Sequence, residues 1–349
     1  MTVIALLGAG IFAKEEHLPA IEAADALTLG AVYSRSQKSA EALAASATLG
    51  TDGKTPDVYF DSPATAGRSL DDLLARSDIQ AIVISLPILV QPAVITKALA
   101  AGKHVLSEKP IAKDVAAAKE LIQSHKGSPI WAVAENFRFL EVVNYAADQL
   151  RKIGGAVTSF NMQLFTLIGD DDKFFNTEWR KVPEYQGGFL LDGGVHFVAG
   201  LRHMLAAVDG QDLARVSAAT TLLQPKLAPV DTVQAVLTTT KGVIGSFSVS
   251  FGIEHKGAFQ IEVVTTKGIV TLTPTDVTSK WLEGTEKKEN KKEFSFSSGV
   301  KPEVAAFAAS IPSGKVDPRQ SPQEALKDLA ALEAMLTSAD KGGQPVTLE

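Results

Sequence analysis

The sequence predicts an α/β protein with two domains, the first built on a doubly wound parallel sheet and the second on a large, mainly antiparallel sheet. Up to about residue 130, short β-branched runs alternate with Ala- and Leu-rich segments of helical spacing, as parallel strands joined by crossover helices do. The hydrophobic period then changes to two, which is typical of strands that bury one face. The 349 residues also suit two domains of roughly 150 residues each.

The first predicted domain covers residues 1–130 and contains the alternating strands and helices. Its strands are the short β-branched runs, and its helices are the segments between them. The expected strands are Val3 to Leu7, Leu29 to Tyr33, Ala81 to Ser85 and His104 to Leu106, and the expected helices are Ser36 to Ala47, Ser69 to Ser77, Gln91 to Ala101 and Val115 to Ser124.

The second predicted domain covers residues 131–349. A further strand at Trp131 to Ala134 and a helix at Val142 to Lys152 come first. Ser246 to Phe251 and Phe259 to Val263 then alternate without a slip, as strands of an antiparallel sheet with one buried face do. The remaining expected strands are Val157 to Phe165, Ala214 to Leu223, Thr232 to Thr239 and Ile269 to Leu272.

Two segments near the end of the chain are interpreted as structure without chemistry. Gly284 to Ser298 is rich in Lys and Glu, so we expect a solvated hairpin or loop rather than a binding patch. Ser321-Pro322-Gln323-Glu324 is a capping box with proline at the first helical position. It predicts a helix over about 322–339 that packs back through a stripe of leucines.

Composition and charge exclude several classes of protein. The chain carries 34 basic and 40 acidic residues, a net charge of −6, and no basic run that would neutralise a row of phosphates, so no nucleic-acid partner is expected. The absence of cysteine excludes disulfides and thiolate catalysis, and it suits a reducing compartment. The location expected is therefore cytoplasmic.

No membrane partner is expected either. The N-terminus MTVIALLGAG has no basic segment or cleavage site of a signal peptide. The most apolar window, Ala81 to Ile95, is interrupted by Pro87 and Pro92. It is shorter than the roughly 20 apolar residues of a membrane span.

A glycine turn follows the first predicted strand. Gly8-Ala9-Gly10-Ile11-Phe12-Ala13 fits G-x-G-x-x-G/A between a strand and a helix, the context of a Rossmann dinucleotide site. Gly8 permits the tight turn, Gly10 lets the backbone approach the pyrophosphate, and Ala13 keeps the helix close to the strand. The alternative is a turn that only joins strand to helix.

The end of the second strand predicts the cofactor. NAD enzymes usually place an acidic residue there, whereas this chain has Ser34, Arg35 and Lys38 in Tyr33-Ser34-Arg35-Ser36-Gln37-Lys38. A serine and cations suit a 2′-phosphate through charge-assisted hydrogen bonds, so we expect NADP(H). The alternative is a solvated Arg35 and an enzyme that accepts either cofactor.

Two further segments carry candidate catalytic groups. Lys109, in GKHVLSEKP, follows a parallel strand at the edge where open α/β sheets bind ligands, and Glu108 is placed to tune its pKa. If the run after Gly188 is helical, Asp192 and His196 share one face. The alternatives are a surface pair or half of a metal site; no metal is expected, because the histidines lack paired ligand spacing.

GAGIFA, AGKHVLSEKPIAKD and WRKVPEYQGGFLLDGGVHFVAGLRHML together resemble the Gfo/Idh/MocA oxidoreductases, named for glucose-fructose oxidoreductase and inositol dehydrogenase. The resemblance covers nearly the whole chain. It implies a Rossmann domain, a second domain whose sheet often mediates dimers or tetramers, and hydride transfer between the nicotinamide and a carbinol or carbonyl carbon. It also implies that Lys109, Asp192 and His196 are catalytic. Either Lys109 or His196 would transfer the proton, and Asp192 would orient the substrate.

The chain also departs from the family pattern. The common T-P-N and His after the fourth strand are replaced by Ser85-Leu86-Pro87-Ile88-Leu89-Val90-Gln91, and Glu135-Asn136-Phe137-Arg138 replaces an aromatic-Asn-Arg stretch. This variant and DGGVH look most similar to a fungal NADP(H) branch. The cofactor contacts expected are Gly8, Gly10, Ile11, Phe12, Ser34, Arg35, Lys38, Leu86, Pro87, Glu108, Lys109 and Asn136.

The function expected is hydride transfer between NADP(H) and a carbonyl or secondary alcohol of a sugar-like or small carbonyl substrate. Trp179 and Arg180 are expected to contact that substrate with Asp192 and His196, and a packing role is the alternative for Trp179 and Arg180. Two rival functions are a dihydrodiol or pentose dehydrogenase and a weakly catalytic NADP(H)-sensing regulator. A homodimer, or a dimer of dimers, is expected through the second sheet.

Overall fold

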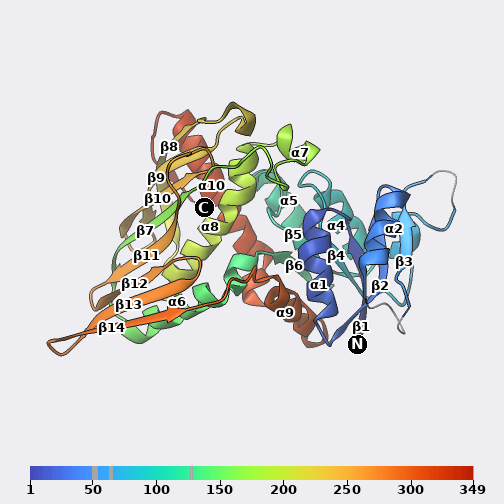
Figure 1. The fold of residues 1–349 in the computed structure, drawn as a ribbon, viewed down its shortest axis with the longest axis horizontal. Helices are drawn as coiled ribbons and strands as arrows, with labels where there is room; N and C mark the ends of the chain where they lie inside the picture. The colour runs from blue at the N-terminus through green and yellow to red at the C-terminus, as the bar shows by residue number, and fades with distance from the viewer. Residues whose placement is uncertain (49–53, 63–65, 126, 128, 349) are drawn as a thin grey trace. The chain divides into compact units, whose positions relative to one another are not determined.

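The computed structural model describes residues 1–48, 54–62, 66–125, 127 and 129–348. They form two compact units, both visible in Figure 1. Unit 1 is Met1–Asn136 with Ser298–Leu326, and unit 2 is Phe137–Ser297 with Lys327–Glu349. The units differ from the predicted division at 130/131, because residues 131–136 and 298–326 pack in unit 1.

Unit 1 contains a six-stranded sheet in the order β3-β2-β1-β4-β5-β6. All its strand pairs are parallel, so the predicted doubly wound sheet is confirmed. The strand order reverses direction between β1 and β4, and such a switch point is where open α/β sheets bind ligands. The strands are β1 Thr2–Leu7, β2 Leu27–Ser34, β3 Asp57–Phe60, β4 Ala81–Ile84, β5 His104–Glu108 and β6 Trp131–Ala134.

Some helices of unit 1 begin at a residue whose side chain caps the helix N-terminus. Ser36 Oγ accepts a hydrogen bond from Ser39 N at the start of α2, and Asp114 caps α5 through Ala117 N, as N-cap residues do. The helices are a π-helical turn η1 Ala13–His17, α1 Leu18–Glu22, α2 Gln37–Ser46, α3 Leu70–Leu74, α4 Gln91–Ala100, α5 Val115–Ser124, α9 Val300–Ser313 and the 3-10 turn η5 Pro318–Gln320.

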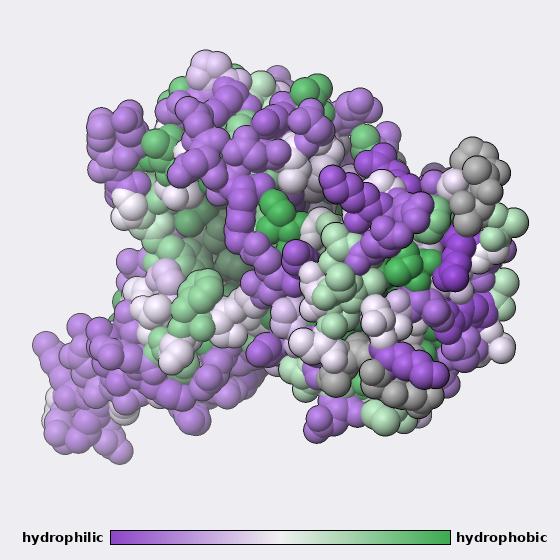
Figure 2. Space-filling model, turned by 45° about the vertical axis from the view of Figure 1, so that its right-hand side comes forward, coloured by the Kyte–Doolittle hydropathy of each residue, from purple (hydrophilic) through white to green (hydrophobic). Residues whose placement is uncertain are grey.

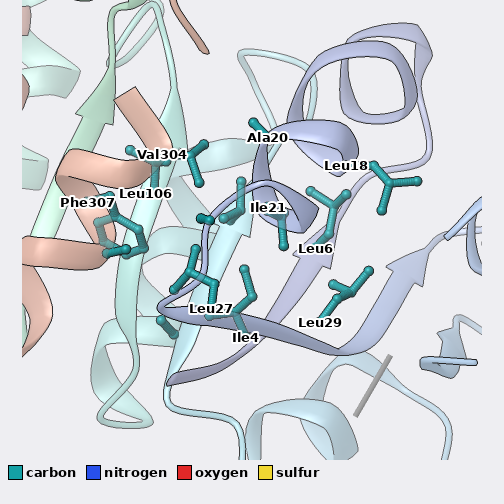
Figure 3. Close-up of a cluster of buried hydrophobic side chains, with 14 of the residues drawn as sticks. Ile4, Leu6, Leu18, Ala20, Ile21, Leu27, Leu29, Leu106, Val304 and Phe307 are labelled. Carbon is teal, nitrogen blue, oxygen red and sulfur yellow. The ribbon is translucent and has the colours of Figure 1, made fainter. Parts of the chain in front are cut away.

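Helix α9 comes late in the chain but belongs to the core of unit 1. Val304 and Phe307 point into the apolar cluster that Ile4 of β1 and Ile21 of α1 share (Figure 3). Phe307 is fully buried, and burying an aromatic side chain contributes roughly 1.5–3 kcal/mol. This packing is the physical reason why residues 298–326 belong to unit 1 rather than to the second predicted domain.

Unit 2 contains a nine-stranded sheet in the order β14-β13-β12-β11-β7-β10-β9-β8-β15. Only the pair β7–β10 is parallel among its described strands, so the predicted mainly antiparallel sheet is confirmed. The strands are β7 Val157–Phe165, β8 Leu213–Thr221, β9 Thr232–Thr239, β10 Ile244–Ser250, β11 Ala258–Thr265, β12 Gly268–Leu272, β13 Asp276–Glu283, β14 Glu286–Glu293 and β15 Val346–Thr347.

Helices cover one face of this sheet. Figure 1 shows α6 and α8 lying against it, and α8 in turn packs on α10 through Gly194 and Leu332. The helical elements are η3 Asn136–Phe139, α6 Glu141–Ile153, α7 Glu178–Lys181, α8 Gly188–Ala206, η4 Pro225–Leu227 and α10 Pro322–Asp340, whose first residues lie in unit 1.

The Lys- and Glu-rich segment Gly284 to Ser298 supplies β14 of a solvated hairpin, as predicted. Its charges pair along the strands, with Lys280 Nζ 3.3 Å from a carboxylate oxygen of Glu289. Figure 2 shows the hairpin as a hydrophilic surface. Within the described ranges, no helix combines the length and hydropathy needed to cross a membrane.

Candidate active site

The glycine turn lies at the switch point of the unit 1 sheet. Gly8 has φ +107°, and its N–H donates to the carbonyl oxygen of Tyr33. A Cβ at Gly8 would lie 2.0 Å from the carbonyl oxygen of Ser85 and 3.4 Å from Leu86 Cδ2. Only glycine fits this position, and two predicted cofactor contacts, Gly8 and Leu86, are thereby brought together.

Gly10 differs from Gly8 because it faces open space. A Cβ at Gly10 would meet nothing within 4 Å, so packing does not require glycine there. The helical segment begins at Ile11, and its Ala13 is fully buried against the sheet. The exposed backbone at Gly10 and the helix N-terminus form a cradle that fits a pyrophosphate.

The end of β2 presents the side chains predicted to select the cofactor. Ser34 is half-buried, and Arg35 and Lys38 are exposed. Tyr33 donates a hydrogen bond of 2.8 Å to Asp61. Burial, followed by this bond and the Asp61 charge, raises the pKa of Tyr33, and Arg35 acts in the opposite direction. Asp61, just after β3, is therefore an acidic group bound to Tyr33 at the end of β2 that sequence reasoning missed.

Lys109 follows directly after the end of β5. The preceding residue, Glu108, accepts the backbone N–H of Lys109 at 3.2 Å through Oε2. Its other oxygen, Oε1, lies 2.6 Å from Nε2 of the fully buried His17. His17 also contacts the ring of Phe12 edge-on at 5.3 Å. The carboxylate beside Lys109 is thus held at both oxygens, and the predicted contacts Phe12 and Glu108 are linked through a residue that was not predicted.

Two further carboxyl groups are buried near this pair. Glu303 of α9 and Glu135 after β6 are 1% and 2% exposed. Burial, and then the charges of Glu108 and Glu135, raises the pKa of Glu303 well above its ordinary value. Burial in this environment therefore favours the neutral, protonated form of the Glu303 carboxyl group. Asn136, predicted as a cofactor contact, donates its side-chain N–H to the carbonyl oxygen of Ser298 at 2.6 Å.

Asp192 lies in the first turns of α8 and is held by an arginine. Its Oδ2 accepts the Nε–H of Arg180 at 2.7 Å, and the Asp192 side chain is only 5% exposed. The Arg180 guanidinium also lies 4.0 Å from the centroid of the Trp179 ring, so it covers one face of the indole expected to meet the substrate. Unit 2 therefore joins three of the predicted substrate contacts in one cluster.

His196 lies one helical turn beyond Asp192 on the same helix. The predicted i, i+4 arrangement is confirmed, because residues 188–206 form α8. The half-buried imidazole stacks on the ring of Phe137, with centroids 4.8 Å apart and planes 17° from parallel. Phe137 in turn meets Phe197 and Phe259 edge-on, so an aromatic cluster fixes the plane of the imidazole.

The two glycines between Asp192 and His196 let α8 pack closely. A Cβ at Gly193 would lie 2.8 Å from Phe251 Cζ, and one at Gly194 would lie 3.0 Å from Leu332 Cδ1. A larger side chain at Gly193 or Gly194 would displace the sheet or α10. The D-G-G-V-H spacing thus places both candidate side chains, Asp192 and His196, on a helix that packs closely against the sheet on one side and α10 on the other.

A buried ion-pair network anchors the far end of α8. Asp328 of α10 accepts from Arg138 and from Arg202, at 2.5 and 2.6 Å, and these three side chains are 3–4% exposed. Arg202 also binds both carboxylate oxygens of Asp212 at 2.8 Å. Burial raises the pKa of Asp212, but the hydrogen bonds and charge of Arg202 outweigh burial and lower this pKa to about 2.

Comparison with known proteins assigns the chain to a family. Residues 3–130 match the model of the oxidoreductase family with an NAD-binding Rossmann fold, and residues 147–271 match that of the GFO/IDH/MocA C-terminal domain. The chain belongs to the GFO/IDH/MocA oxidoreductase family. It is therefore an oxidoreductase with a domain for a nicotinamide cofactor, and the resemblance drawn from its motifs is confirmed.

Two of three similar proteins match this chain over almost its full length. A protein named dehydrogenase FPY6 from Fusarium mangiferae is 53% identical and covers 97% of both chains, which supports the fungal branch. An oxidoreductase from Thermotoga maritima has a TM-score of 0.84 at 30% identity, covering 99% of this chain and 98% of its own. A dTDP-3,4-didehydro-2,6-dideoxy-alpha-D-glucose 3-reductase of Streptomyces antibioticus is 29% identical over 72% of this chain and 69% of its own.

Several residues of this family member escaped sequence reasoning. They have in common that only the fold reveals their surroundings; Asp61 is exposed, and the other four side chains are buried or half-buried. No group of three or more His, Asp or Glu side chains suited to a metal ion occurs in the described part of the chain. The missed residues are His17, Asp61, Phe137, Tyr185 and Glu303.

Proposed function

We propose that this protein transfers a hydride between NADP(H) and a carbonyl or secondary alcohol of a sugar-like or small carbonyl substrate. The observation that carries the proposal is the glycine turn, in which Gly8 packs on Ser85 at the switch point and Gly10 leaves open space. When bound, the nicotinamide supplies or accepts the hydride. The named activity of the sugar 3-reductase relative supports a sugar-like substrate.

The preference for NADP(H) is proposed from the end of β2. Arg35 and Lys38 are exposed there, and guanidinium and ammonium groups suit a 2′-phosphate. Tyr33 holds the carboxylate of Asp61 at 2.8 Å, which reduces the competition of that carboxylate for a ribose hydroxyl. Ser34, Leu86, Pro87, Glu108 and Asn136 are proposed as further cofactor contacts with Ile11 and Phe12.

The catalytic roles are proposed for side chains of both units. Lys109 or His196 gives a proton to the substrate oxygen as the carbonyl is reduced, and takes it back in the reverse direction. Asp192, fixed by Arg180, orients the substrate. The stacking of His196 on Phe137 supports its role, because an aligned imidazole loses less freedom when it reacts.

The experiment is to follow NADPH absorbance with a panel of aldoses, ketoses, aldehydes and diketones. Lys109→Ala and His196→Ala are then compared with Lys113→Ala, which removes an exposed lysine from the same loop. We expect Lys109→Ala to reduce kcat by about 100-fold or more and Lys113→Ala to leave it unchanged. The kcat of wild type and of both variants is also measured as a function of pH. The variant whose kcat loses the pH dependence seen in wild type lacks the proton donor. Equal activity of Lys109→Ala and wild type would contradict the proposal.

Cofactor choice needs its own pair of variants. Arg35→Asp should shift the NADPH-to-NADH preference by about 10-fold to 100-fold towards NADH, the value of a hydrogen bond to a charged group. Arg35→Lys keeps the charge and should keep most of the preference. An unchanged ratio in Arg35→Asp would remove the NADP(H) assignment.

Two rival functions give different results in the same assays. Turnover of vicinal dihydrodiols or pentoses above all other compounds would favour a dihydrodiol or pentose dehydrogenase. Tight NADPH binding with no turnover of any compound would favour a sensor of cofactor redox state. The Arg180–Asp192 pair and the fixed imidazole of His196 favour the enzyme.

We further propose a homodimer, or a dimer of dimers, that forms through the unit 2 sheet in the cytoplasm. Val236 and Ile244 on neighbouring strands of that sheet are 53% and 61% exposed, and an apolar sheet surface of this kind suits a second copy. Sedimentation of wild type and Val236→Asp tests the assembly. A monomeric wild type would contradict it.

A further inference from the structure

Tyr185 carries a buried polar group that the packing of unit 2 does not use. It lies between α7 and α8, is 8% exposed, and its hydroxyl oxygen has no hydrogen-bond partner among the described residues. Buried hydroxyl groups are nearly always paired, because an unpaired one loses its hydration without compensation. A phenylalanine would fill nearly the same volume without the cost of burying an unpaired hydroxyl. We therefore expect the hydroxyl to have a hydrogen-bond partner outside the described residues.

The surroundings of Tyr185 are the substrate cluster proposed above. Its ring lies 6.2 Å from the ring of Trp179. Burial, and then the charge of Asp192, raises the pKa of the Tyr185 phenol, while Arg180 acts in the opposite direction. The phenol is therefore protonated throughout the physiological range and has an O–H to donate. The charges that act on it are those of the Arg180–Asp192 pair.

The side chains over this cluster are weakly anchored. Helix α7, which carries Trp179 and Arg180, has no buried residue. Among the described residues, the hydrogen bonds of Arg180 Nη1 are two long ones of 3.4 Å, to Phe174 O and Thr177 Oγ1, whereas Nε lies 2.7 Å from Asp192 Oδ2. Long bonds are weak, so the outer end of the guanidinium can swing aside while its inner end keeps Asp192 in place.

We propose that the Tyr185 hydroxyl is a substrate-binding group that donates a hydrogen bond to a hydroxyl or carbonyl oxygen of the substrate. The inference rests on the proposed function and narrows its substrate class. Tyr185 and the outer guanidinium of Arg180 donate, and Asp192 accepts, so the cluster suits a compound with at least two neighbouring oxygens. A sugar or polyol fits this set of donors and acceptors, and a simple apolar aldehyde does not.

The test compares two tyrosine-to-phenylalanine variants that remove the same atom. Tyr145, on α6, accepts a hydrogen bond of 2.8 Å from Asn290, so Tyr145→Phe should lower the melting temperature and leave the kinetics unchanged. Tyr185→Phe should melt at or above the wild-type temperature, because it removes an unpaired group. It should also raise KM for the best sugar in the NADPH panel by at least about 10-fold, with kcat within about threefold.

A second arm identifies the oxygen that receives the bond. Each monodeoxy analogue of the best sugar is measured with wild type and Tyr185→Phe. We expect the KM ratio between the two proteins to fall to about one for one analogue only, because that analogue lacks the partner of the hydroxyl. A ratio that stays the same for every analogue would overturn the inference.

The outcomes separate this inference from the proposed function. If wild type turns over no compound in the panel, the proposed function fails and the substrate role of Tyr185 fails with it. If wild type is active and Tyr185→Phe has the wild-type KM, only the inference is overturned. A lowered melting temperature of Tyr185→Phe, with unchanged KM, would assign the hydroxyl to packing instead.

Discussion

His17 Nε2 lies 2.6 Å from Glu108 Oε1 although the two residues are 91 positions apart. His17 sits in the π-helical turn that follows the glycine turn, and Glu108 ends β5 just before Lys109. π-helical turns within helices occur frequently at functional sites. The contact therefore ties the element proposed to face the cofactor pyrophosphate to the residue beside the proposed catalytic lysine.

Loss of the imidazole should leave the Glu108 carboxylate buried without this partner. The Glu108 side chain is 12% exposed, so His17→Leu should lower the free energy of unfolding by about 2–3 kcal/mol. His17→Gln offers an amide N–H in its place and should recover at least half of that loss. Urea unfolding at pH 7 measures both variants. Equal stability of His17→Leu and wild type would mean that the contact contributes nothing.

The two glycines of the turn should respond differently to the same change. Gly8→Ala places a Cβ 2.0 Å from the Ser85 carbonyl oxygen at φ +107°, which the backbone cannot accommodate, so we expect a loss of at least about 3 kcal/mol of stability. Gly10→Ala meets nothing within 4 Å and should melt as wild type does. It should nevertheless weaken NADPH binding by about 10-fold or more, because the methyl group enters the pyrophosphate cradle.

Calorimetry and NADPH fluorescence titration measure the two effects separately. A Gly10→Ala variant that binds NADPH as wild type does would show that the pyrophosphate lies elsewhere. Folding of Gly8→Ala with wild-type stability would contradict the close approach to Ser85.

The sequence was sufficient for features with local causes. The parallel sheet, the Asp192–His196 spacing and the solvated hairpin were predicted because periodicity, glycine placement and charge are properties of short segments. Lys109, Arg35 and the glycine turn were predicted as site residues because each lies at a recognisable strand end. Contacts between distant segments have no such local signal.

The features that escaped prediction show why. Helix α9 was missed because Pro302 and Pro312 interrupt a weak pattern, and its role in unit 1 depends on packing against α1. Strand β3 has four residues, as β4 and β6 do, but it begins at the exposed Asp57 and lacks the fully buried apolar run that marks the other two. The stacking of Phe137 on His196 joins residues 59 positions apart. It arises because the fold brings η3 next to α8.

Glu303 should make stability depend on pH in an unusual direction. The fold raises the pKa of Glu303 above its unfolded value, so its contribution to stability is fully present below the unfolded pKa, about 4.3, and declines as pH rises towards the folded pKa. Glu303→Gln mimics the neutral acid and loses this dependence. The variant should therefore become progressively more stable than wild type between pH 5 and 8.

Urea unfolding at several pH values checks this expectation, and Glu286→Gln, an exposed carboxylate on β14, is the control that should follow wild type. A constant difference between Glu303→Gln and wild type across the range would mean that the proton is not retained in the fold.

Asp212 should make stability depend on pH in the opposite direction to Glu303. Its pKa in the fold is lowered to about 2, so the stability it contributes is present above the unfolded pKa, about 3.9, and is lost as pH falls towards 2. The difference of almost two pKa units corresponds to about 2.5 kcal/mol at pH 7. Asp212→Asn should lose this amount at pH 7, and its deficit should shrink between pH 4 and 2.

The exposed ion pair of Asp148 with Arg151 provides the matched comparison. Asp148→Asn should lose less than about 1 kcal/mol at pH 7, because exposed pairs are screened by solvent. Guanidinium unfolding would mask the charges, so urea is the denaturant for both variants. If Asp212→Asn and Asp148→Asn lose the same small amount of stability, the ion pair of Arg202 with Asp212 contributes little. In that case Asp328 is the partner that matters for Arg202, and the network that anchors α8 does not extend to Asp212.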